Sequence, residues 1–190
     1  ELTAGDIGAI SGCETFDIGD TINSNSSIAP LKRIHVEPPT LGMIFSVNTS
    51  PLSGKEGEAI QSRKLRDRLL KEVRHNVALR FAETDLPDQF RVLGRGELQF
   101  AILVEQMRRE GFEFMIGKPQ VLLKTDESGQ SMEPIEKVTL DLPETYSGEV
   151  TRLFQERKGT LLSYNPLNLE SSVPRIRLEF EIPTRGLLGI

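Results

Sequence analysis

The residues best suited to chemistry are few in this chain and lie far apart. The two histidines, His35 and His75, are forty residues apart, and Cys13 is the single cysteine. A zinc site needs about four clustered nitrogen, sulfur or carboxylate ligands, which this spacing does not provide. We therefore expect no metal and no cofactor in this chain. A lone cysteine also forms no intrachain disulfide, which is compatible with a reducing cytoplasm.

Two glycine-containing stretches could in principle hold an anion. A P-loop needs glycine six positions before its lysine and Ser or Thr directly after it. Around the Gly54–Lys55 pair, Thr49 and Glu56 occupy those positions, so a flexible surface loop is the better interpretation. Gly94–Gly96 precedes a predicted helix and is interpreted as a tight turn rather than an anion site. No nucleophile or base accompanies either stretch, so we expect no catalytic residue here.

The densest positive charge lies on a predicted amphipathic helix over 60–76. Leu65, Leu69 and Val73 recur at a spacing of four, which is typical of a buried helical stripe. The segment 61–75 holds six bases and two acids, in a chain of net charge −5. Such a helix could bind phosphates of RNA or an acidic protein, or it could simply be a solvated face. The candidate contact residues on this helix are Arg63, Lys64, Arg66, Lys71 and Arg74.

Hydrophobic periodicity predicts an α+β protein whose first unit spans 38–117, after a boundary at the prolines 38 and 39. The expected elements are strands at 41–48, 77–82, 90–93 and 112–116, with helices at 60–76 and 97–110. This order, β-α-β-β-α-β, is that of a ferredoxin-like split sandwich.

The hydrophobic pattern of residues 118–190 predicts a connector and the first part of a second ferredoxin-like sandwich. Strands are expected at 135–142, 160–164 and 173–182, with a helix at 147–158 and a loop at 165–172. Ile176, Leu178, Phe180 and Ile182 alternate with charged residues in the last strand. Because one helix must cover all four, we expect a bare apolar face that associates with a neighbouring chain or is poorly ordered.

The first 37 residues do not look like the start of a domain. Two strand-like pieces, 6–10 and 17–22, precede a polar loop at 23–30. Two strands cannot close a barrel by themselves, so we interpret them as remnant strands of a β-barrel. A disordered segment is the alternative.

The composition is that of a globular protein, with 190 residues, 37% hydrophobic and 27% charged. No apolar run approaches the roughly 20 residues that span a bilayer. The first residues lack the basic start and apolar core of a signal peptide. We therefore expect no membrane association.

Several motifs resemble the elongation factor G-like translational GTPases, and their order and spacing are most similar to the TypA/BipA ribosome-associated branch. The matching motifs are Asn48–Pro51, Gly54–Gly57, His75–Arg80, Gly94–Leu98, Arg108–Glu113, Glu156–Gly159 and Pro183–Gly189.

This resemblance implies a division of the chain and a role for each part. Residues 1–37 would be the tail of the second-domain barrel plus a linker. Residues 38–117 would be the third domain, and 118–190 a connector and the first part of the fifth. The chain would then be the ribosome-docking middle region. It would contact ribosomal RNA and ribosomal proteins through the basic helix and through Arg152, Arg157, Lys158 and Arg185.

For the whole protein, the resemblance implies GTP and Mg²⁺ bound in a separate GTPase domain, and GTP hydrolysis on the 70S ribosome during translation, ribosome assembly or stress adaptation. It also implies a C-terminal domain that reaches toward tRNA. The alternative is a free-standing ferredoxin-like regulatory or small-phosphatase module. A free-standing protein should begin and end outside its domains, whereas this sequence is expected to begin and end inside them.

Overall fold

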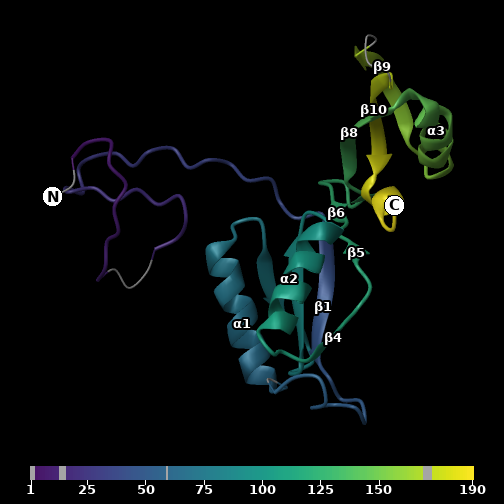
Figure 1. The fold of residues 1–190 in the computed structure, drawn as a ribbon. Helices are drawn as coiled ribbons and strands as arrows, with labels where there is room; N and C mark the ends of the chain where they lie inside the picture. Colours follow the sequence, from purple (N-terminus) through teal and green to yellow (C-terminus); the bar gives the residue numbers. More distant parts are fainter. Residues whose placement is uncertain (1–2, 13–15, 59, 169–172) are drawn as a thin grey trace.

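The computed structural model describes residues 3–12, 16–58, 60–168 and 173–190. An irregular N-terminal segment is followed by two α/β units (Figure 1). The first unit contains β1 (Leu41–Val47), α1 (Ser62–His75), β2 (Arg80–Glu83), β3 (Gln89–Gly94), α2 (Glu97–Arg109) and β4 (Phe114–Ile116). The predicted β-α-β-β-α-β order and the α+β class are therefore confirmed.

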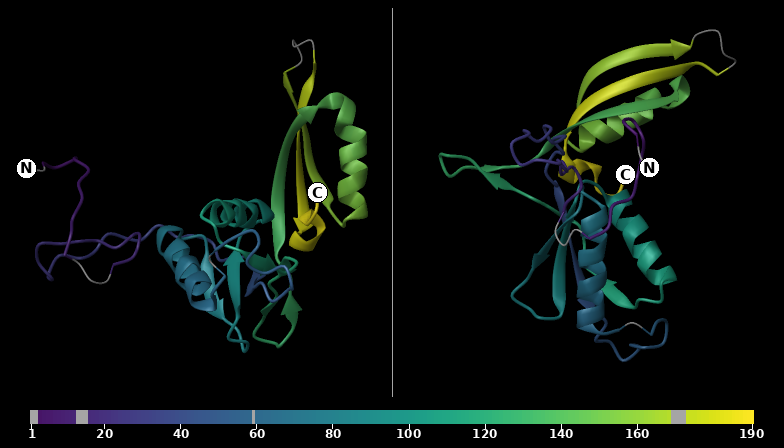
Figure 2. Two further views of the ribbon diagram at one scale, coloured as in Figure 1. Left: turned by 60° about the horizontal axis from the view of Figure 1, so that its bottom comes forward. Right: turned by 90° about the vertical axis from the view of Figure 1, so that its left-hand side faces the viewer.

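The sheet of the first unit has the strand order β2-β3-β1-β4, and all of its pairings are antiparallel. A short strand, β5 (Gln120–Val121), also pairs with β1, where Leu41 lies opposite Val121. Helices α1 and α2 lie on the same face of the sheet (Figures 1 and 2). This is the split-sandwich topology, in which the two central strands come from the two halves of the unit.

The first core lies between these helices and the sheet, and its buried residues come from every layer. Leu65 and Leu69 of α1 are buried, as the spacing of four predicts. The other fully buried side chains include Phe45, Val92, Phe100, Leu103 and Met107. The largest boundary difference in this unit is at β2, which begins at Arg80 rather than at residue 77. Residues 76–79 instead form a turn in which the amide of Leu79 donates to the carbonyl of Asn76 at 3.0 Å.

The second unit begins with a hairpin of β6 (Lys124–Thr125) and β7 (Ser131–Met132). It continues through β8 (Ile135–Pro143), a 3-10 turn (Glu144–Tyr146), α3 (Ser147–Glu156), β9 (Thr160–Asn168), β10 (Arg175–Pro183) and α4 (Thr184–Leu187). The strand order is β8-β10-β9, with antiparallel pairing throughout.

Strand β9 is longer than its sequence predicts. A loop was expected from residue 165, but the strand continues to Asn168, and Pro166 lies opposite Ile176 of β10. Proline has no N–H to donate, so it is tolerated in a strand with one free edge, and β9 is such an edge strand. Residues 169–172 of the expected loop lie outside the described residues.

The predicted bare apolar face on the last strand is wrong. The four apolar side chains of β10 are exposed by at most 1%. Because β10 is central, both neighbouring strands flank it and α3 lies across it, with the rings of Phe154 and Phe180 4.6 Å apart. Partial exposure remains around this core, for example at Val138, Leu140 and Leu142 of β8, which are half-buried.

The predicted remnant strands near the N-terminus do not form in the described residues. Neither 3–12 nor 16–40 contains a strand, and Ile7 is 99% exposed. The backbone bonds found there close local turns, such as the amide of Asp20 donating to the carbonyl of Asp17 at 3.1 Å. A β-strand needs a paired neighbour for its backbone and a layer for its apolar side chains. This segment has neither within the described chain, so its strand-like sequence stays irregular.

Candidate functional site

The outward face of α1 presents a row of exposed cations. Arg63, Lys64, Lys71 and Arg74 lie on the side of the helix opposite Leu65 and Leu69. The Arg63 side chain is 91% exposed, and its nearest acid, Asp67, is 3.9 Å away. In the described part of the chain, no salt bridge reaches the other three cations within 4 Å. This face therefore offers four long, exposed positive side chains to a partner.

Arg66, the fifth predicted residue of α1, points to the flank of the helix. Its Nη2 and Nε donate to Oε1 of Glu83, at the end of β2, over 2.6 and 3.0 Å. Both side chains remain substantially exposed. Arg66 can therefore contact a partner only if that partner displaces Glu83 from the ion pair.

Arg68 is the most deeply covered base of α1. Its side chain is 12% exposed and contacts Glu72 of its own helix and Glu110 after α2. The hydrogen bonds that it donates to Glu110 raise the pKa of this guanidinium, and the same contact lowers the pKa of the Glu110 carboxyl. Arg68 therefore joins the two helices rather than serving as a contact residue.

The four predicted cations of the second unit differ in their surroundings. Arg152 pairs with Glu156 at 3.0 Å and Arg185 with Glu133 at 3.0 Å, both at exposed positions. Arg157 is half-buried, and its Nη1 donates to the carbonyls of Gly186 and Leu188 at 3.1 and 2.9 Å, which holds the segment after β10. These cations and the α1 face form two separate surfaces, because α1 belongs to the first unit and α3 to the second, and the two helices lie well apart (Figures 1 and 2).

Lys158 stands out by its backbone. It is exposed, and it is the one described residue other than glycine with a positive φ, at 68°. It ends α3 in the left-handed conformation that usually falls to glycine. Glycine stands one position later instead, because a Cβ on Gly159 would lie 2.9 Å from the carbonyl oxygen of Phe154. The side chain of Lys158 thus projects from a sharply defined helix end.

Sequence reasoning missed Glu113, which organises the loop at 48–57. Its Oε1 accepts hydrogen bonds from the side-chain amide of Asn48 and the backbone N–H of Gly54, at 2.7 and 2.9 Å. Its Oε2 accepts from the backbone N–H groups of Glu56 and Gly57, at 2.9 and 3.1 Å. The available signal was an acid between two phenylalanines in a predicted strand, a position where a charged residue needs partners.

These hydrogen bonds also explain the glycine-rich loop that failed the P-loop test. The amides that might have held a phosphate converge on a carboxylate of the same chain. The hydrogen bonds, that from the Glu56 amide first, lower the pKa of the Glu113 carboxyl below its ordinary 4.5. Gly57 packs so closely that a Cβ there would lie 2.6 Å from the carbonyl oxygen of Gly111. The loop is therefore organised as part of the fold, with its anion position already filled.

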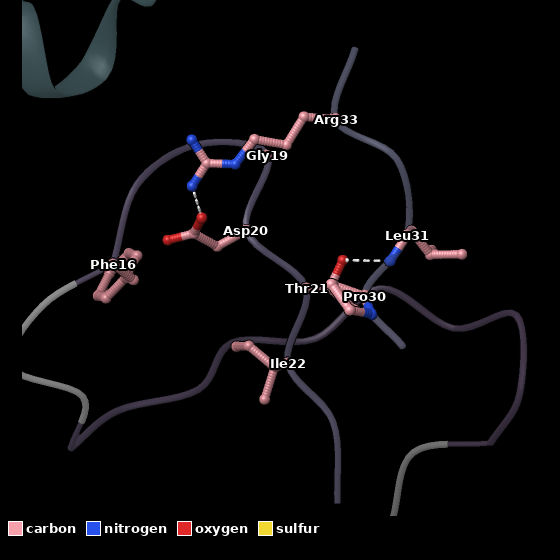
Figure 3. Close-up of a pocket in the computed structure, with 8 residues that line it drawn as sticks. All are labelled: Phe16, Gly19, Asp20, Thr21, Ile22, Pro30, Leu31 and Arg33. Carbon is pink, nitrogen blue, oxygen red and sulfur yellow. Dashed lines mark hydrogen bonds and ion pairs between the residues drawn. The ribbon is translucent and has the colours of Figure 1, made fainter. Parts of the chain in front are cut away.

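Figure 3 shows a hollow in the irregular N-terminal segment. Arg33 forms an ion pair with Asp20 there, and the amide of Leu31 donates to Oγ1 of Thr21 at 3.0 Å. The remaining lining is mostly apolar or backbone, including Phe16 and Ile22, and it brings no nucleophile and base together. Among the described residues, no group of three or more His, Cys, Asp and Glu side chains could hold a metal ion. In the same residues, no helix is both long and apolar enough to cross a membrane.

Comparison with known proteins identifies relatives along almost the whole chain. Residues 130–190 match the family described as elongation factor G C-terminus. The chain is 47% identical to the large ribosomal subunit assembly factor BipA of Escherichia coli strain K12 over 186 residues, which cover 98% of this chain and 30% of the relative. The proteins of the same name from Buchnera aphidicola and Haemophilus influenzae are 46% and 45% identical, over 98% of this chain and 30% and 29% of the relatives.

The chain thus spans about a third of the length of the curated relatives that it matches. The similarity nevertheless extends across both α/β units and the N-terminal segment, at an identity well above the level at which a shared fold could be accidental. Over the segment that it represents, this chain belongs to the BipA family of elongation factor G-like proteins.

Proposed function

We propose that this chain is the ribosome-docking middle region of a BipA-type translational GTPase. The outward face of α1 carries the proposal. Among the described residues, Lys64, Lys71 and Arg74 have no acid within 4 Å there, and Arg63 has only Asp67 at 3.9 Å, while Arg66 and Arg68 of the same helix are held by Glu83 and Glu110. The name of the relatives, large ribosomal subunit assembly factor, supports a ribosomal partner.

The partner of this face is the phosphate backbone of ribosomal RNA. At a rise of about 1.5 Å per residue, Lys64 and Arg74 lie roughly 15 Å apart along the helix, with Lys71 between them. A row of long cations suits a repeating charge more than a shaped protein pocket. Three or four neutralised phosphates would give a log–log salt slope of about −3.

The second unit provides a separate contact in this proposal. Lys158, Arg152 and Arg185 would face RNA or ribosomal protein, while Arg157 keeps the segment after β10 in place. We also propose the division into 1–37, 38–117 and 118–190, with 1–37 as the tail of a second-domain barrel and its linker. Two separate hydrophobic cores support a division into two units, with Val121 and Leu188 of the 118–190 part packed against the first core.

For the whole protein, we propose GTP hydrolysis with Mg²⁺ in a domain other than this one, in the cytoplasm. Its ribosomal contacts would include ribosomal proteins and, through a further domain, tRNA. A second copy of this chain is a further proposed partner. GTP itself should not bind to these 190 residues alone, and isothermal titration with GTP and Mg²⁺ checks that part of the proposal.

The docking face is tested by co-sedimentation of the chain with ribosomes and with isolated large subunits across a salt series. Reversal of all four cations, in R63E/K64E/K71E/R74E, should reduce binding at least tenfold and flatten the salt slope. The matched control K32E/K55E/K118E/K124E changes the net charge by the same amount at exposed lysines elsewhere. Equal losses in both variants, or unchanged binding in the first, would show that α1 is only a solvated face.

A further inference from the structure

The segment that follows β10 lies between the two units (Figures 1 and 2). Its two consecutive leucines contact different cores, because Leu187 packs against the second core and Leu188 against the first. Units joined by a connector move relative to each other unless an interface holds them. A segment that touches both cores therefore bears on how the units are oriented.

We propose that three of the family motifs form a joint that fixes the orientation of the second unit on the first. The motifs are Gly94–Leu98 at the start of α2, Glu156–Gly159 at the end of α3, and Pro183–Gly189 between them. Arg157 is the positioning residue of this joint. The inference does not depend on ribosome docking, since every contact that carries it lies within the chain.

Arg157 holds the intervening segment on the second unit. Its half-buried side chain donates from Nη1 to the carbonyls of Gly186 and Leu188, at 3.1 and 2.9 Å. Hydrogen bonds from a charged donor are stronger than those between neutral groups. The backbones also meet, because a Cβ on Gly186 would lie 2.7 Å from the carbonyl oxygen of Arg157. One residue at the end of α3 thus fixes the segment through both its side chain and its backbone.

The same segment reaches the first unit at the start of α2. Leu188 packs against the first core, and the amide of Gly189 donates to Oε2 of Glu97 at 3.1 Å. Glu97 is exposed, so water competes for this hydrogen bond, and removal of the Leu188 side chain from water contributes more to the contact. Arg157 acts on the first unit through this leucine, whose carbonyl it holds.

A second contact between the units lies at the start of β8. Oε1 of Glu136 accepts a hydrogen bond from Oγ1 of Thr184 at 2.7 Å. Oγ1 of Thr40, directly before β1, lies 3.4 Å from the same oxygen and 3.2 Å from the carbonyl oxygen of Arg95. The single hydroxyl proton of Thr40 can be donated to either acceptor. Two contacts at different places restrict rotation of the units, whereas one contact would leave a pivot.

The joint explains why neighbouring cations at the end of α3 differ. Arg157 is half-buried because it holds the segment after β10, whereas Lys158 is exposed. A fixed joint also fixes the relation between the cations of α1 and those of the second unit. A partner that contacts both surfaces then binds without first ordering the two units, which reduces the entropic cost of binding.

Residual dipolar couplings of the complete chain test the joint, because bodies that are rigidly joined share one alignment tensor. In the parent chain, one tensor should fit the couplings of both units. Arg157→Met keeps much of the side-chain stem but removes its donors, so the two units should then need two different tensors. Arg152→Met is the matched control, since Arg152 is a cation of the same helix that pairs with Glu156 at 3.0 Å. This control should keep one tensor.

Leu188→Ser tests the other end of the joint and leaves Arg157 and the second core in place. It removes the apolar contact with the first core and should also give two tensors. Leu86→Ser is its matched control. Leu86 is 54% exposed in the turn between β2 and β3, at the end of the sheet away from Gly94. One tensor should still fit both units of this control.

Three results would overturn the proposal. The parent chain could need two tensors. A single tensor in either Arg157→Met or Leu188→Ser would mean that the chain between β4 and β8 fixes the orientation by itself. Two tensors in a control variant would show that the loosening is not specific to the joint. The couplings within each unit report whether it is folded, and if Arg157→Met disrupts the second unit, Leu188→Ser decides.

Discussion

Arg68 of α1 and Glu110 at the end of α2 form a two-pronged ion pair that joins the helices of the first unit. Nε and Nη2 of Arg68 donate to Oε2 and Oε1 of Glu110 at 2.5 and 2.8 Å. The guanidinium also donates to Glu72 at 2.8 Å. Arg68 thus joins two helices and Arg66 pairs with Glu83, which leaves the other four of the six bases on the outward face for a partner.

Replacing Arg68 with alanine should lower the free energy of unfolding by about 1–2 kcal/mol, because two carboxylates lose hydrogen bonds to a charged group at a largely covered position. Urea denaturation at neutral pH measures this loss. Ribosome affinity and its salt slope should remain unchanged. The matched variant Arg63→Ala should change stability by at most about 0.5 kcal/mol, because its partner is 3.9 Å away and the pair is exposed. A reversal of these two outcomes would contradict the roles assigned to the residues.

Replacing Glu113 with glutamine should loosen the loop at 48–57. Glutamine keeps one acceptor oxygen but turns an amide donor toward backbone N–H groups that also donate. Hydrogen exchange at the amides of Gly54, Glu56 and Gly57 should therefore become faster, while exchange in α1 stays as it was. Asn48→Ala is a milder comparison, because it removes one of the four donors and leaves the carboxylate in place.

The contribution of Glu113 to stability should depend on pH in a defined direction. Its folded pKa lies below the ordinary value of 4.5, since the backbone hydrogen bonds favour the charged form. The stabilisation is therefore fully present above pH 4.5 and is lost as the pH falls through the lower folded pKa. The difference in unfolding free energy between the parent chain and Glu113→Gln should shrink on acidification. A difference that is constant with pH would show that the carboxylate charge has no part in it.

Replacing Lys158 with glycine should separate its backbone role from its charge. Glycine adopts a φ of 68° without the cost that a Cβ imposes, so the free energy of unfolding should rise by about 1 kcal/mol. Ribosome binding should weaken at the same time, because the cation is gone. Lys158→Ala removes the charge but keeps the backbone cost, and should weaken binding without the gain in stability. Thermal unfolding and co-sedimentation measure the two effects.

Core substitutions should test whether the two units unfold separately. Leu69→Ala in the first core should cost about 2–5 kcal/mol, and Phe180→Ala in the second about 3–5 kcal/mol. Because the two cores consist of different residues, each change should lower the transition of its own unit. Calorimetry combined with hydrogen exchange in each unit detects this. A single transition lowered equally by both changes would mean that the units unfold as one.

Local patterns in the sequence were sufficient for most of the fold. The spacing of four at Leu65 and Leu69, and the alternation around Leu178 and Phe180, each identify one buried face of an element, and both predictions are confirmed. Gly111, which ends α2 with a φ of +83°, was equally readable as a stop signal. These features depend on neighbours a few residues away, so they can be recognised before any tertiary contact is known.

The features that the sequence did not reveal depend on residues far apart in the chain. Six cations on one helix look alike in sequence, and only Glu83 and Glu110, brought close by the fold, distinguish Arg66 and Arg68 from the other four. In the same way, the sequence of the 48–57 loop shows only that a P-loop is absent. The structure adds that the amides of this loop donate to the carboxylate of Glu113.

The amino-acid sequence by itself determined the element order, the family and which helix is basic, because periodicity and motif spacing are local. The tertiary structure alone decided which charges are free and whether the apolar face of β10 is covered. Those properties are set by contacts between segments that are distant in sequence, and no local pattern records such contacts.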